Sequence, residues 1–420
     1  MSNSIGKYIQ LQGGFAFKSS DFRESGIPLI RISNVTENGL NKSDAVFLPE
    51  EFIDELKDFL LKENDTLIAM SGATTGKCCL IKSTDIPGFI NQRVGRFRIL
   101  NEKETDKLFV YHVVNSSRFK DELLKDAFGS AQPNVSPRDI ENVKWYFPSF
   151  TEQQHIAKIL STADAVIEKT QAAIAKYKAI KQGMLQDLFT RGIDLNTNKL
   201  RPRYEDAPEL YKESKLGMIP REWEVEKIGK IFRFNQGVQC PVELQKLHQG
   251  ENEVRFIRII DLTNEGEPPR YIADPGSQYH INSNDLFMVR YGSPGLVGYG
   301  YEGVIANNLF RIISTGELEI LNSFYRYYLT SINDKLTALS ASTTMPAINF
   351  DSLNKLHVIY PQIFEQVEIE KRIKAIDNKL QTEQNYLQKM QSLKKGLMED
   401  LLCGKKQVKV AEEVLTQSEN

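Results

Sequence analysis

Two stretches of the sequence decide the fold: residues 133–154, PNVSPRDIENVKWYFPSFTEQQ, and residues 346–367, PAINFDSLNKLHVIYPQIFEQV. They align without a gap and share two prolines and a Glu–Gln pair (Pro133/Pro346, Pro148/Pro361, Glu152/Glu365 and Gln153/Gln366). The same offset, near 213 residues, continues through Lys181/Lys394, Gly183/Gly396 and Asp187/Asp400. Because self-similarity at a fixed period is typical of repeated structural units, the sequence indicates a tandem duplication.

The duplication extends upstream of these stretches with small insertions. The segment IGKYIQLQGG (5–14) matches IGKIFRFNQG (228–237), and IPLIRISNVTENG (27–39) matches VRFIRIIDLTNEG (254–266). Further along, NDTLIAMSG (64–72) matches NDLFMVRYG (284–292). All of these blocks occur in the same order in both halves, so each half is one complete unit.

The first part of each unit is rich in β-strand signals. Short apolar runs such as PLIRI, DTLIAM, RFIRII and DLFMVRY alternate with glycine and proline, which is typical of strands and turns. A helical piece follows late in each unit, at 108–127 and 321–339. The sequence therefore predicts an α+β fold class, with two mixed α/β domains.

The second part of each unit is one long helix. Pro148 ends the preceding strand, Ser149 is a suitable N-cap, and Glu152 completes a capping box. Apolar residues then recur in heptads over about five repeats, which predicts a coiled coil. The residues expected in the helix-pair core are Ile156, Leu160, Ile167, Ile174, Tyr177 and Leu188, with Ile369, Ile373, Ile376, Leu380, Leu387, Leu397 and Leu401.

The two helices are expected to pack antiparallel, with pseudo-twofold symmetry between the units. Lys181 and Lys394 occupy equivalent positions beside the core in the heptad frame. Parallel packing in register would place these like charges side by side in a partly desolvated seam, which is unfavourable. Antiparallel packing separates them.

The domain boundaries follow from these patterns. We expect a first globular domain (1–149), a first long spacer helix (150–191) and a polar connector (192–226). A second globular domain (227–360), a second long spacer helix (361–404) and a polar tail that frays (405–420) complete the chain.

Composition excludes several classes of protein. The 420 residues are 41% hydrophobic and 26% charged, which excludes a wholly disordered chain. No apolar run approaches the roughly 20 residues of a membrane span, and the N-terminus lacks a signal-peptide pattern, so a cytoplasmic protein is expected. Four cysteines without C-x-x-C spacing argue against a structural zinc site or a disulfide framework.

The motifs that could carry catalysis do not complete any known pattern. Gly72-Ala-Thr-Thr-Gly76-Lys77 resembles a phosphate-binding loop, but its glycines are one residue too close and Cys78 replaces the Ser or Thr that holds magnesium. A strand–turn–strand connection is the better interpretation. Cys78-Cys79 is interpreted as a packed strand pair, and neither methyltransferase nor nuclease motifs are present.

Polar loops within the two domains contain residue types that read DNA bases. Arginine pairs with guanine, and asparagine or glutamine pairs with adenine, in the major groove. Such residues are also common in ordinary loops, and the net charge of −2 gives no sign of nucleic-acid binding. The candidates are Ser71, Thr74, Thr75, Lys77, Asn91, Gln92, Arg93, Gln132 and Asn134 in the first domain, and Arg290, Tyr291, Ser293, Asn307, Asn308, Thr343 and Thr344 in the second.

The whole pattern resembles one family, the specificity subunits of type I restriction–modification systems. The most specific strings are the helix openings PSFTEQQHIAKIL (148–160) and PQIFEQVEIEKRI (361–373). The helix ends KQGMLQDLFTRG (181–192) and KKGLMEDLLCG (394–404) and the segment KLGMIPREWEV (215–225) add to it. The first domain begins at Ile5 without that last segment, which is a departure from the pattern.

The resemblance implies a subunit without an active site. Its two target-recognition domains would bind the two halves of a bipartite site in double-stranded DNA. Two methyltransferase subunits and two restriction subunits would join it, and the cofactors S-adenosylmethionine, ATP and Mg²⁺ would belong to these partners. A modification-only system and a coiled-coil scaffold without a DNA role stay open as alternatives.

Overall fold

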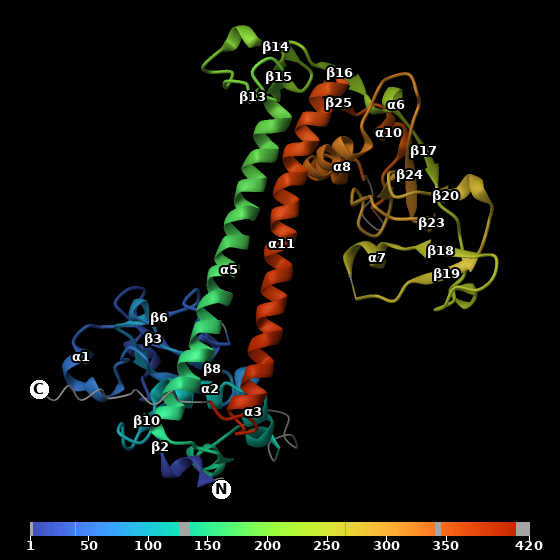
Figure 1. Cartoon of the computed structure of the whole chain (residues 1–420). Coiled ribbons are helices and arrows are strands. Elements are labelled where there is room, and N and C mark those ends of the chain that lie inside the picture. The colour runs from blue at the N-terminus through green and yellow to red at the C-terminus, as the bar shows by residue number, and fades with distance from the viewer. Residues whose placement is uncertain (1–2, 38, 126–133, 265, 341–345, 409–420) are drawn as a thin grey trace, which may run out of the picture. The chain divides into compact units, whose positions relative to one another are not determined.

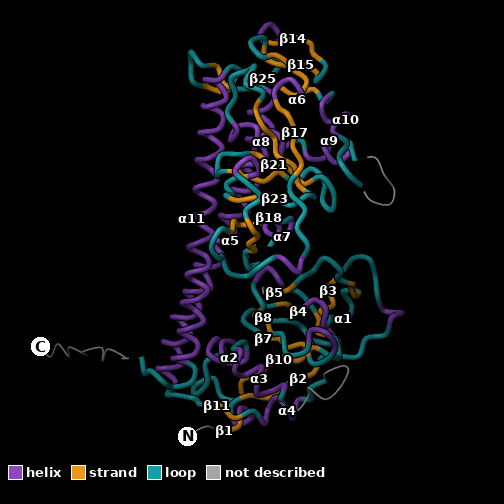
Figure 2. The backbone as a smooth tube through the Cα atoms, turned by 90° about the vertical axis from the view of Figure 1, so that its right-hand side faces the viewer, coloured by secondary structure: helices purple, strands orange, loops and turns teal. Residues whose placement is uncertain are grey.

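The computed structural model of the chain describes residues 3–37, 39–125, 134–264, 266–340 and 346–408. These residues form two units: Met1–Ala172 with Gln384–Asn420, here called unit 1, and Ala173–Glu383, here called unit 2. Each unit contains one globular domain and a part of both long helices (Figure 1). Most of the strands lie in the globular domains, and the two longest helices pack against these domains within each unit (Figure 2).

The domain of unit 1 is built on two small sheets. The larger is antiparallel, with the order β2-β10-β7-β8 (Ile9–Gly13, Val94–Ile99, Thr66–Ala69 and Cys78–Leu80). The smaller is β6-β3-β9 (Val46–Leu48, Ile27–Ile30 and Phe89–Ile90), in which β3 and β9 are parallel. The remaining elements are the strand pairs β1-β11 (Asn3–Ser4 and Lys144–Trp145) and β4-β5 (Val35–Thr36 and Gly39–Leu40), and the helices α1 (Phe52–Glu55), α2 (Lys107–Val114), α3 (Ser117–Leu124) and α4 (Pro137–Asn142).

The domain of unit 2 repeats this topology. Its antiparallel sheet has the order β17-β24-β21-β22 (Phe232–Gln236, Leu309–Ser314, Leu286–Val289 and Val297–Gly298). A second sheet is β19-β18-β23-β20 (Arg270–Ala273, Glu253–Ile257, Gly303–Ile305 and His280–Ile281), with β18 and β23 parallel. The other elements are the strand pair β16-β25 (Glu224–Lys227 and His357–Tyr360) and the helices α6 (Ile228–Ile231), α7 (Ile259–Thr263), α8 (Asn322–Ser331), α9 (Asn333–Ala338) and α10 (Phe350–Asn354).

Each helical piece predicted within a domain is two helices in the structure. In unit 1 the piece divides into α2 and α3, because the Ser116 side chain accepts a hydrogen bond from the backbone of Phe119 and caps a new helix. In unit 2 the corresponding break lies at Ile332, between α8 and α9. Serine competes with the helix for backbone hydrogen bonds, so a helix readily restarts at such a residue.

The long helices are α5 (Phe150–Thr190) and α11 (Ile363–Leu401). Ser149 accepts a hydrogen bond from the backbone of Glu152 at 3.4 Å, as an N-cap does. All of the residues expected in the helix-pair core are buried or half-buried, from Ile156 and Ile369 at the helix starts to Leu188 and Leu401 at the ends. Within the described residues, neither these helices nor any other is long and apolar enough to cross a membrane.

Two reciprocal ion pairs confirm the antiparallel packing of α5 and α11. In unit 1, Lys394 of α11 pairs with Asp164 of α5. In unit 2, Lys181 of α5 pairs with Asp377 of α11, with the ammonium 2.5 Å from the carboxylate. The beginning of α5 therefore lies beside the end of α11, and the end of α5 beside the beginning of α11.

The two ion pairs are the same contact made twice. Asp164 and Asp377 occupy one position of the repeat, and Lys181 and Lys394 occupy another. The roles of the two helices are exchanged between the pairs, as a pseudo-twofold relation requires. The predicted fold class, two mixed α/β domains each followed by a long helix of an antiparallel pair, is thereby confirmed.

The buried glutamine at each helix opening ties the helix to its own domain. The Gln366 side chain donates a hydrogen bond to Pro361 O (2.9 Å) and accepts one from the backbone of Leu321 (2.8 Å). Gln153 makes the equivalent bonds to Pro148 O and from the backbone of Asp106, both at 3.0 Å. The shared Pro and Gln of the repeat thus mark one structural joint in each unit.

The connector between the two repeats (192–226) is folded. The sequence predicted only that it is polar. It forms two hairpins, β12-β13 (Ile193–Asp194 and Lys199–Leu200) and β14-β15 (Tyr211–Ser214 and Gly217–Pro220). Arg201 contacts both carboxylate oxygens of buried Glu365, at 2.6 and 3.1 Å, and Trp223 is fully buried. Arg201 and Glu365 lie far apart in the sequence, so no local pattern could reveal their pairing.

The aspartate of each reciprocal ion pair also faces a side chain of the neighbouring domain. In unit 2, the Tyr327 hydroxyl of α8 donates to Asp377 at 2.7 Å. In unit 1 the same place is taken by His112 of α2, which hydrogen-bonds the Ser161 hydroxyl at 2.9 Å and lies 3.9 Å from Asp164. Burial and the nearby Lys394 lower the pKa of His112 to about 3.

The glutamine joints should contribute measurably to stability. Gln366→Ala leaves a buried N–H and a buried carbonyl without partners, which costs about 1–3 kcal/mol of the free energy of unfolding. Gln153→Ala should cost a similar amount in unit 1. Urea unfolding can be followed by tryptophan fluorescence, because Trp145 lies in unit 1 and Trp223 in unit 2. Gln388→Ala, at an exposed position of α11, is the control, and it should change the free energy of unfolding little. An equal loss of stability in this control would show that the buried glutamines have no special role.

Unit 1 should lose stability in acid faster than unit 2. His112 binds a proton near pH 6.5 when unfolded but only near pH 3 when folded, so stability is full above pH 6.5 and is lost as the pH falls below it. The expected loss is about 1.4 kcal/mol per pH unit below pH 6.5. Urea unfolding at pH 7, 6 and 5, followed by Trp145 in a Trp223→Phe background, measures the slope. His112→Gln should flatten it, whereas Gln388→Ala, at an exposed position of α11, should not.

Candidate nucleic-acid interface

Three predicted segments of unit 1 meet at the end of strand β7. The backbone of Met70, just after the strand, donates to Arg93 O at 3.0 Å and accepts from the backbone of Val135 at 2.9 Å. Ser71 forms a β-bridge with Asn134. The turn 71–77, the turn 91–93 and residue 134 are therefore neighbours, although Ser71 and Asn134 are 63 positions apart in the sequence.

Unit 2 assembles the corresponding segments in the same way. Arg290, after strand β21, donates from its backbone to Asn308 O at 2.9 Å and accepts from the backbone of Ile348 at 2.9 Å. Tyr291 forms a β-bridge with Ala347. Each domain thus has one edge of its main sheet where three loops converge, and the two edges are equivalent in the repeat.

The candidate side chains of unit 1 differ in how free they are to bind a ligand. Gln92, Arg93 and Asn134 are exposed. The hydroxyls of Thr74 and Thr75 donate to backbone carbonyls, Ile32 O at 3.0 Å and Gly72 O at 2.7 Å, so their hydrogens are already used. Ser71, Lys77 and Asn91 are half-buried, and Gln132 lies outside the described residues.

In unit 2 the Arg290 side chain is held in one orientation. Its guanidinium donates to Gln236 Oε1 at 2.7 Å and lies over the ring of Phe350, 4.7 Å from the centroid. Gln236 also donates to the backbone of Asn307 at 2.7 Å. The sequence did not single out Gln236 or Phe350. Gln236 aligns with Gly13 in the repeat, so the duplication gives no signal at that position.

Among the other candidates of unit 2, Asn308 accepts the backbone hydrogen bond of Arg290, and Tyr291 follows Arg290 in the chain. Ser293 is exposed, and Tyr291, Asn307 and Asn308 are half-buried. Thr343 and Thr344 lie outside the described residues. A fixed arginine beside amides offers hydrogen-bond donors and acceptors in a defined geometry, which is what reading a base edge requires.

The glycine-rich turn of unit 1 is a structural connection. It joins antiparallel strands β7 and β8 through a short 3₁₀ turn at Gly72–Thr74, which confirms the strand–turn–strand interpretation. Cys78 and Cys79 lie in β8 and are buried, as the packed-pair interpretation predicted. Burial raises the pKa of the Cys78 thiol to about 12, so it stays protonated near neutral pH.

Comparison with protein families identifies two matching segments. The model of the type I restriction modification DNA specificity domain matches residues 3–177 and again residues 220–392. Each match covers one globular domain and most of the long helix that follows it. Together they take in more than half of the chain.

Individual proteins show the same similarity. The MjaVIII specificity subunit of a type I restriction enzyme from Methanocaldococcus jannaschii is 26% identical over 95% of this chain and 88% of its own length. The EcoBI specificity subunit from Escherichia coli is 23% identical over 89% and 78%. A crystal structure of the type I restriction-modification S subunit from M. genitalium has the same fold, with a TM-score of 0.62, 16% identity and 96% of each chain covered. These matches confirm the resemblance inferred from the helix openings.

Proposed function

Because the chain belongs to the family of type I restriction modification DNA specificity proteins, which are non-catalytic, we propose that it selects the DNA target of a type I restriction–modification complex. Two recognition domains would each read one half of a bipartite site in double-stranded DNA. The observation that carries this proposal is the convergence of three polar loops on one sheet edge, made once in each unit from equivalent segments.

The chemistry of the two edges supports different half-sites. Unit 1 offers Gln92, Arg93 and Asn134, whereas unit 2 offers the oriented Arg290 with Asn307 and Asn308. Arginine favours guanine and the amides favour adenine, so both edges have the residue types that discriminate base pairs in the major groove. Because the two sets differ, the two halves of the target would differ in sequence.

The long helices offer matched surfaces for partner subunits. Ile180 on α5 and Leu393 on α11 occupy the same position of the repeat, and they are 44% and 50% exposed. A single exposed apolar side chain is common on protein surfaces, but its recurrence at the same position of both helices supports a repeated protein interface. Two methyltransferase subunits would dock on these two surfaces, and restriction subunits would join them. S-adenosylmethionine, ATP and Mg²⁺ would be held by these partners, in the cytoplasm.

Changing one reading edge should weaken one half-site and spare the other. Gln92→Ala with Arg93→Ala should cost about 1–3 kcal/mol for each base pair that these residues read in the first half-site. Binding of the assembled complex to a duplex library with each half randomised, at fixed salt, measures both halves. Arg138→Ala, an exposed arginine on α4 of the same domain, is the control. Equal losses of affinity on every DNA sequence would show that Gln92 and Arg93 contact phosphates. A complex that binds all sequences equally would favour the alternative of a coiled-coil scaffold without a DNA role.

Each exposed apolar position should hold one methyltransferase subunit. Ile180→Asp should release one subunit and Leu393→Asp the other, because a carboxylate buried without a partner costs several kcal/mol. The stoichiometry of the purified complex, measured by native mass spectrometry, should fall from two methyltransferase subunits to one in each single variant. Gln388→Asp, exposed on α11, should keep both. Retention of both subunits by the two variants would exclude this docking surface.

A further inference from the structure

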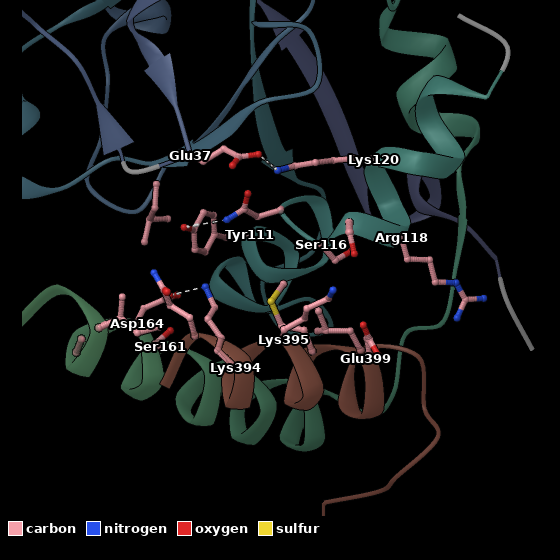
Figure 3. A pocket seen from close by; sticks show the side chains of 18 of the residues that line it. Glu37, Tyr111, Ser116, Arg118, Lys120, Ser161, Asp164, Lys394, Lys395 and Glu399 are labelled. Atoms are coloured by element: carbon pink, nitrogen blue, oxygen red, sulfur yellow. Dashed lines mark hydrogen bonds and ion pairs between the residues drawn. The ribbon is translucent and has the colours of Figure 1, made fainter. Parts of the chain in front are cut away.

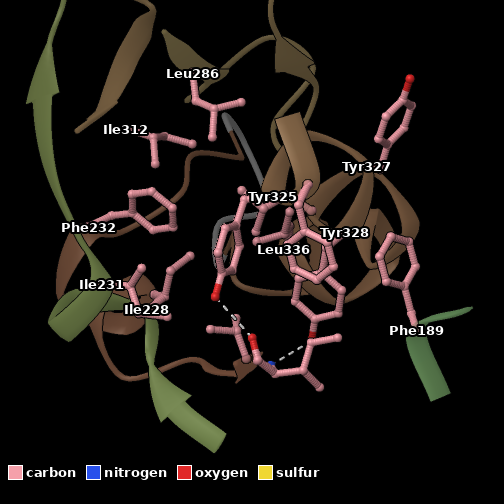
Figure 4. Packing of buried hydrophobic residues seen from close by; sticks show 14 of the residues in the cluster. Phe189, Ile228, Ile231, Phe232, Leu286, Ile312, Tyr325, Tyr327, Tyr328 and Leu336 are labelled. Atoms are coloured by element: carbon pink, nitrogen blue, oxygen red, sulfur yellow. Dashed lines mark hydrogen bonds between the residues drawn. The ribbon is translucent and has the colours of Figure 1, made fainter. Parts of the chain in front are cut away.

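The loop that follows β17 exposes large apolar side chains. Val242 and Leu244, here called the apolar tip, are 76% and 64% exposed, and Leu247 beyond them is 49% exposed. At the other end of the same strand, Phe232 is fully buried in the core with Ile231 (Figure 4). One exposed apolar side chain is common on a protein surface, but three within six residues form a cluster, and such a cluster indicates a binding surface.

The equivalent loop of unit 1 packs two phenylalanines against its own domain. That loop spans residues 15–26, whereas the loop of unit 2 spans 238–253 and is four residues longer. Phe17 and Phe22 pack against a buried cluster that includes Phe89. Apolar side chains of this loop can therefore be buried in a domain of this fold, and unit 2 leaves its own exposed.

Backbone hydrogen bonds hold the loop of unit 2 at two places. The backbone of Val238 donates to Ile305 O at 2.9 Å. Further on, Lys246 exchanges two backbone hydrogen bonds of 2.9 Å each with Tyr271 of the edge strand β19. The apolar tip lies between these two anchors, so its side chains have a fixed place, and little conformational entropy is lost when they bind a ligand.

The apolar tip lies near the sheet edge where the three loops of unit 2 converge. Val238 forms a β-bridge with Ala306, next to Asn307 and Asn308 of that edge. Val242 is four residues further along, so it lies within about 14 Å of Val238 even if the chain between them is extended. This distance is about four base pairs of duplex, at about 3.4 Å each. The tip and the edge can therefore face the same few base pairs.

The chemistry of the tip fits an apolar group of a base and not a phosphate. Residues 238–245, VQCPVELQ, contain one charged side chain, Glu243, and its charge is negative. Phosphates are bound by cations, so this loop is not suited to the DNA backbone. The apolar group that a base presents in the major groove is the C5-methyl of thymine. Contact with that methyl group buries apolar surface on both partners, which is favourable.

We propose that Val242 and Leu244 contact a thymine methyl group in the second half-site and so add to the specificity of unit 2. This inference rests on the proposed function of selecting a DNA target. Arg290 and the amides beside it would supply the hydrogen bonds of the recognition surface, and the tip its apolar contact. If the tip bound a methyltransferase subunit instead, a thymine methyl group would have no effect through these side chains.

Removal of the methyl group alone tests the contact. In the duplex that the assembled complex selects, each thymine of the second half-site is replaced singly by deoxyuridine, which lacks only the C5-methyl. At one position, binding should weaken about fourfold, the loss expected for one apolar carbon taken out of contact. Val242→Ala with Leu244→Ala should weaken binding to the thymine duplex, and the replacement should then cost nothing further. Leu100→Ala is the control and should keep the fourfold loss, because Leu100 is 56% exposed but follows the end of β10 that lies away from Arg93.

The outcomes separate the tip from the proposed function. A deoxyuridine loss of the same size in the double variant as in the unchanged complex would overturn the inference, and so would the absence of a loss at every thymine. If the double variant kept the deoxyuridine loss but released methyltransferase subunits in native mass spectrometry, the tip would belong to a protein interface. A complex that selects no sequence would contradict the proposed function itself.

A native thiol gives a second measurement on the unchanged chain. Cys240 lies two residues before the tip and is a half-exposed free thiol. Cys403, also half-exposed, lines a groove of about 790 Å³ in unit 1 and is the internal reference (Figure 3). The selected duplex, at saturation, should slow alkylation of Cys240 by iodoacetamide at least about fivefold, which corresponds to about four-fifths of the thiol being protected. The rate at Cys403 should stay the same. An unchanged rate at Cys240, or equal protection of both thiols, would overturn the placement of the tip on DNA.

Discussion

The reciprocal pairing of Lys181 with Asp377 and of Lys394 with Asp164 is the constraint on which the rest of the structure depends. The four side chains are half-buried, so each pair adds only about 0–1 kcal/mol to stability, and the apolar seam supplies most of the free energy. The main effect of the ion pairs is on the relative direction of α5 and α11. A parallel arrangement would set lysine opposite lysine and aspartate opposite aspartate, whereas the antiparallel one satisfies all four charges.

The same aspartates connect the helix pair to the domains. Asp377 receives a hydrogen bond from Tyr327, and Asp164 lies near His112, so each carboxylate stands where a domain helix and both long helices meet. The buried glutamines at the helix openings add a second joint a few turns away. In each unit, the sheet edge where the three loops converge therefore belongs to a domain that is fixed to the helices at two places.

Duplication preserved the scaffold and let the surfaces diverge. The glutamine joints, the ion pairs and the strand order of the main sheet are shared by the two units. The side chains on the sheet edges where the three loops converge differ between the two units. Equivalent backbone hydrogen bonds bring the loops together in both units, so the loops converge although their side chains differ.

The sequence alone determined the duplication, the two long helices with their heptad seam and their antiparallel direction, because these depend on periodicity and on the position of like charges. It also located the loops that converge on the sheet edges, since polar turns are recognisable locally. Only the tertiary structure decided which side chains in those loops are free, because the hydroxyls of Thr74 and Thr75 bind carbonyls and Gln236 orients Arg290. The burial of Arg201 against Glu365 likewise depends on residues that are distant in the sequence and meet only when the chain folds.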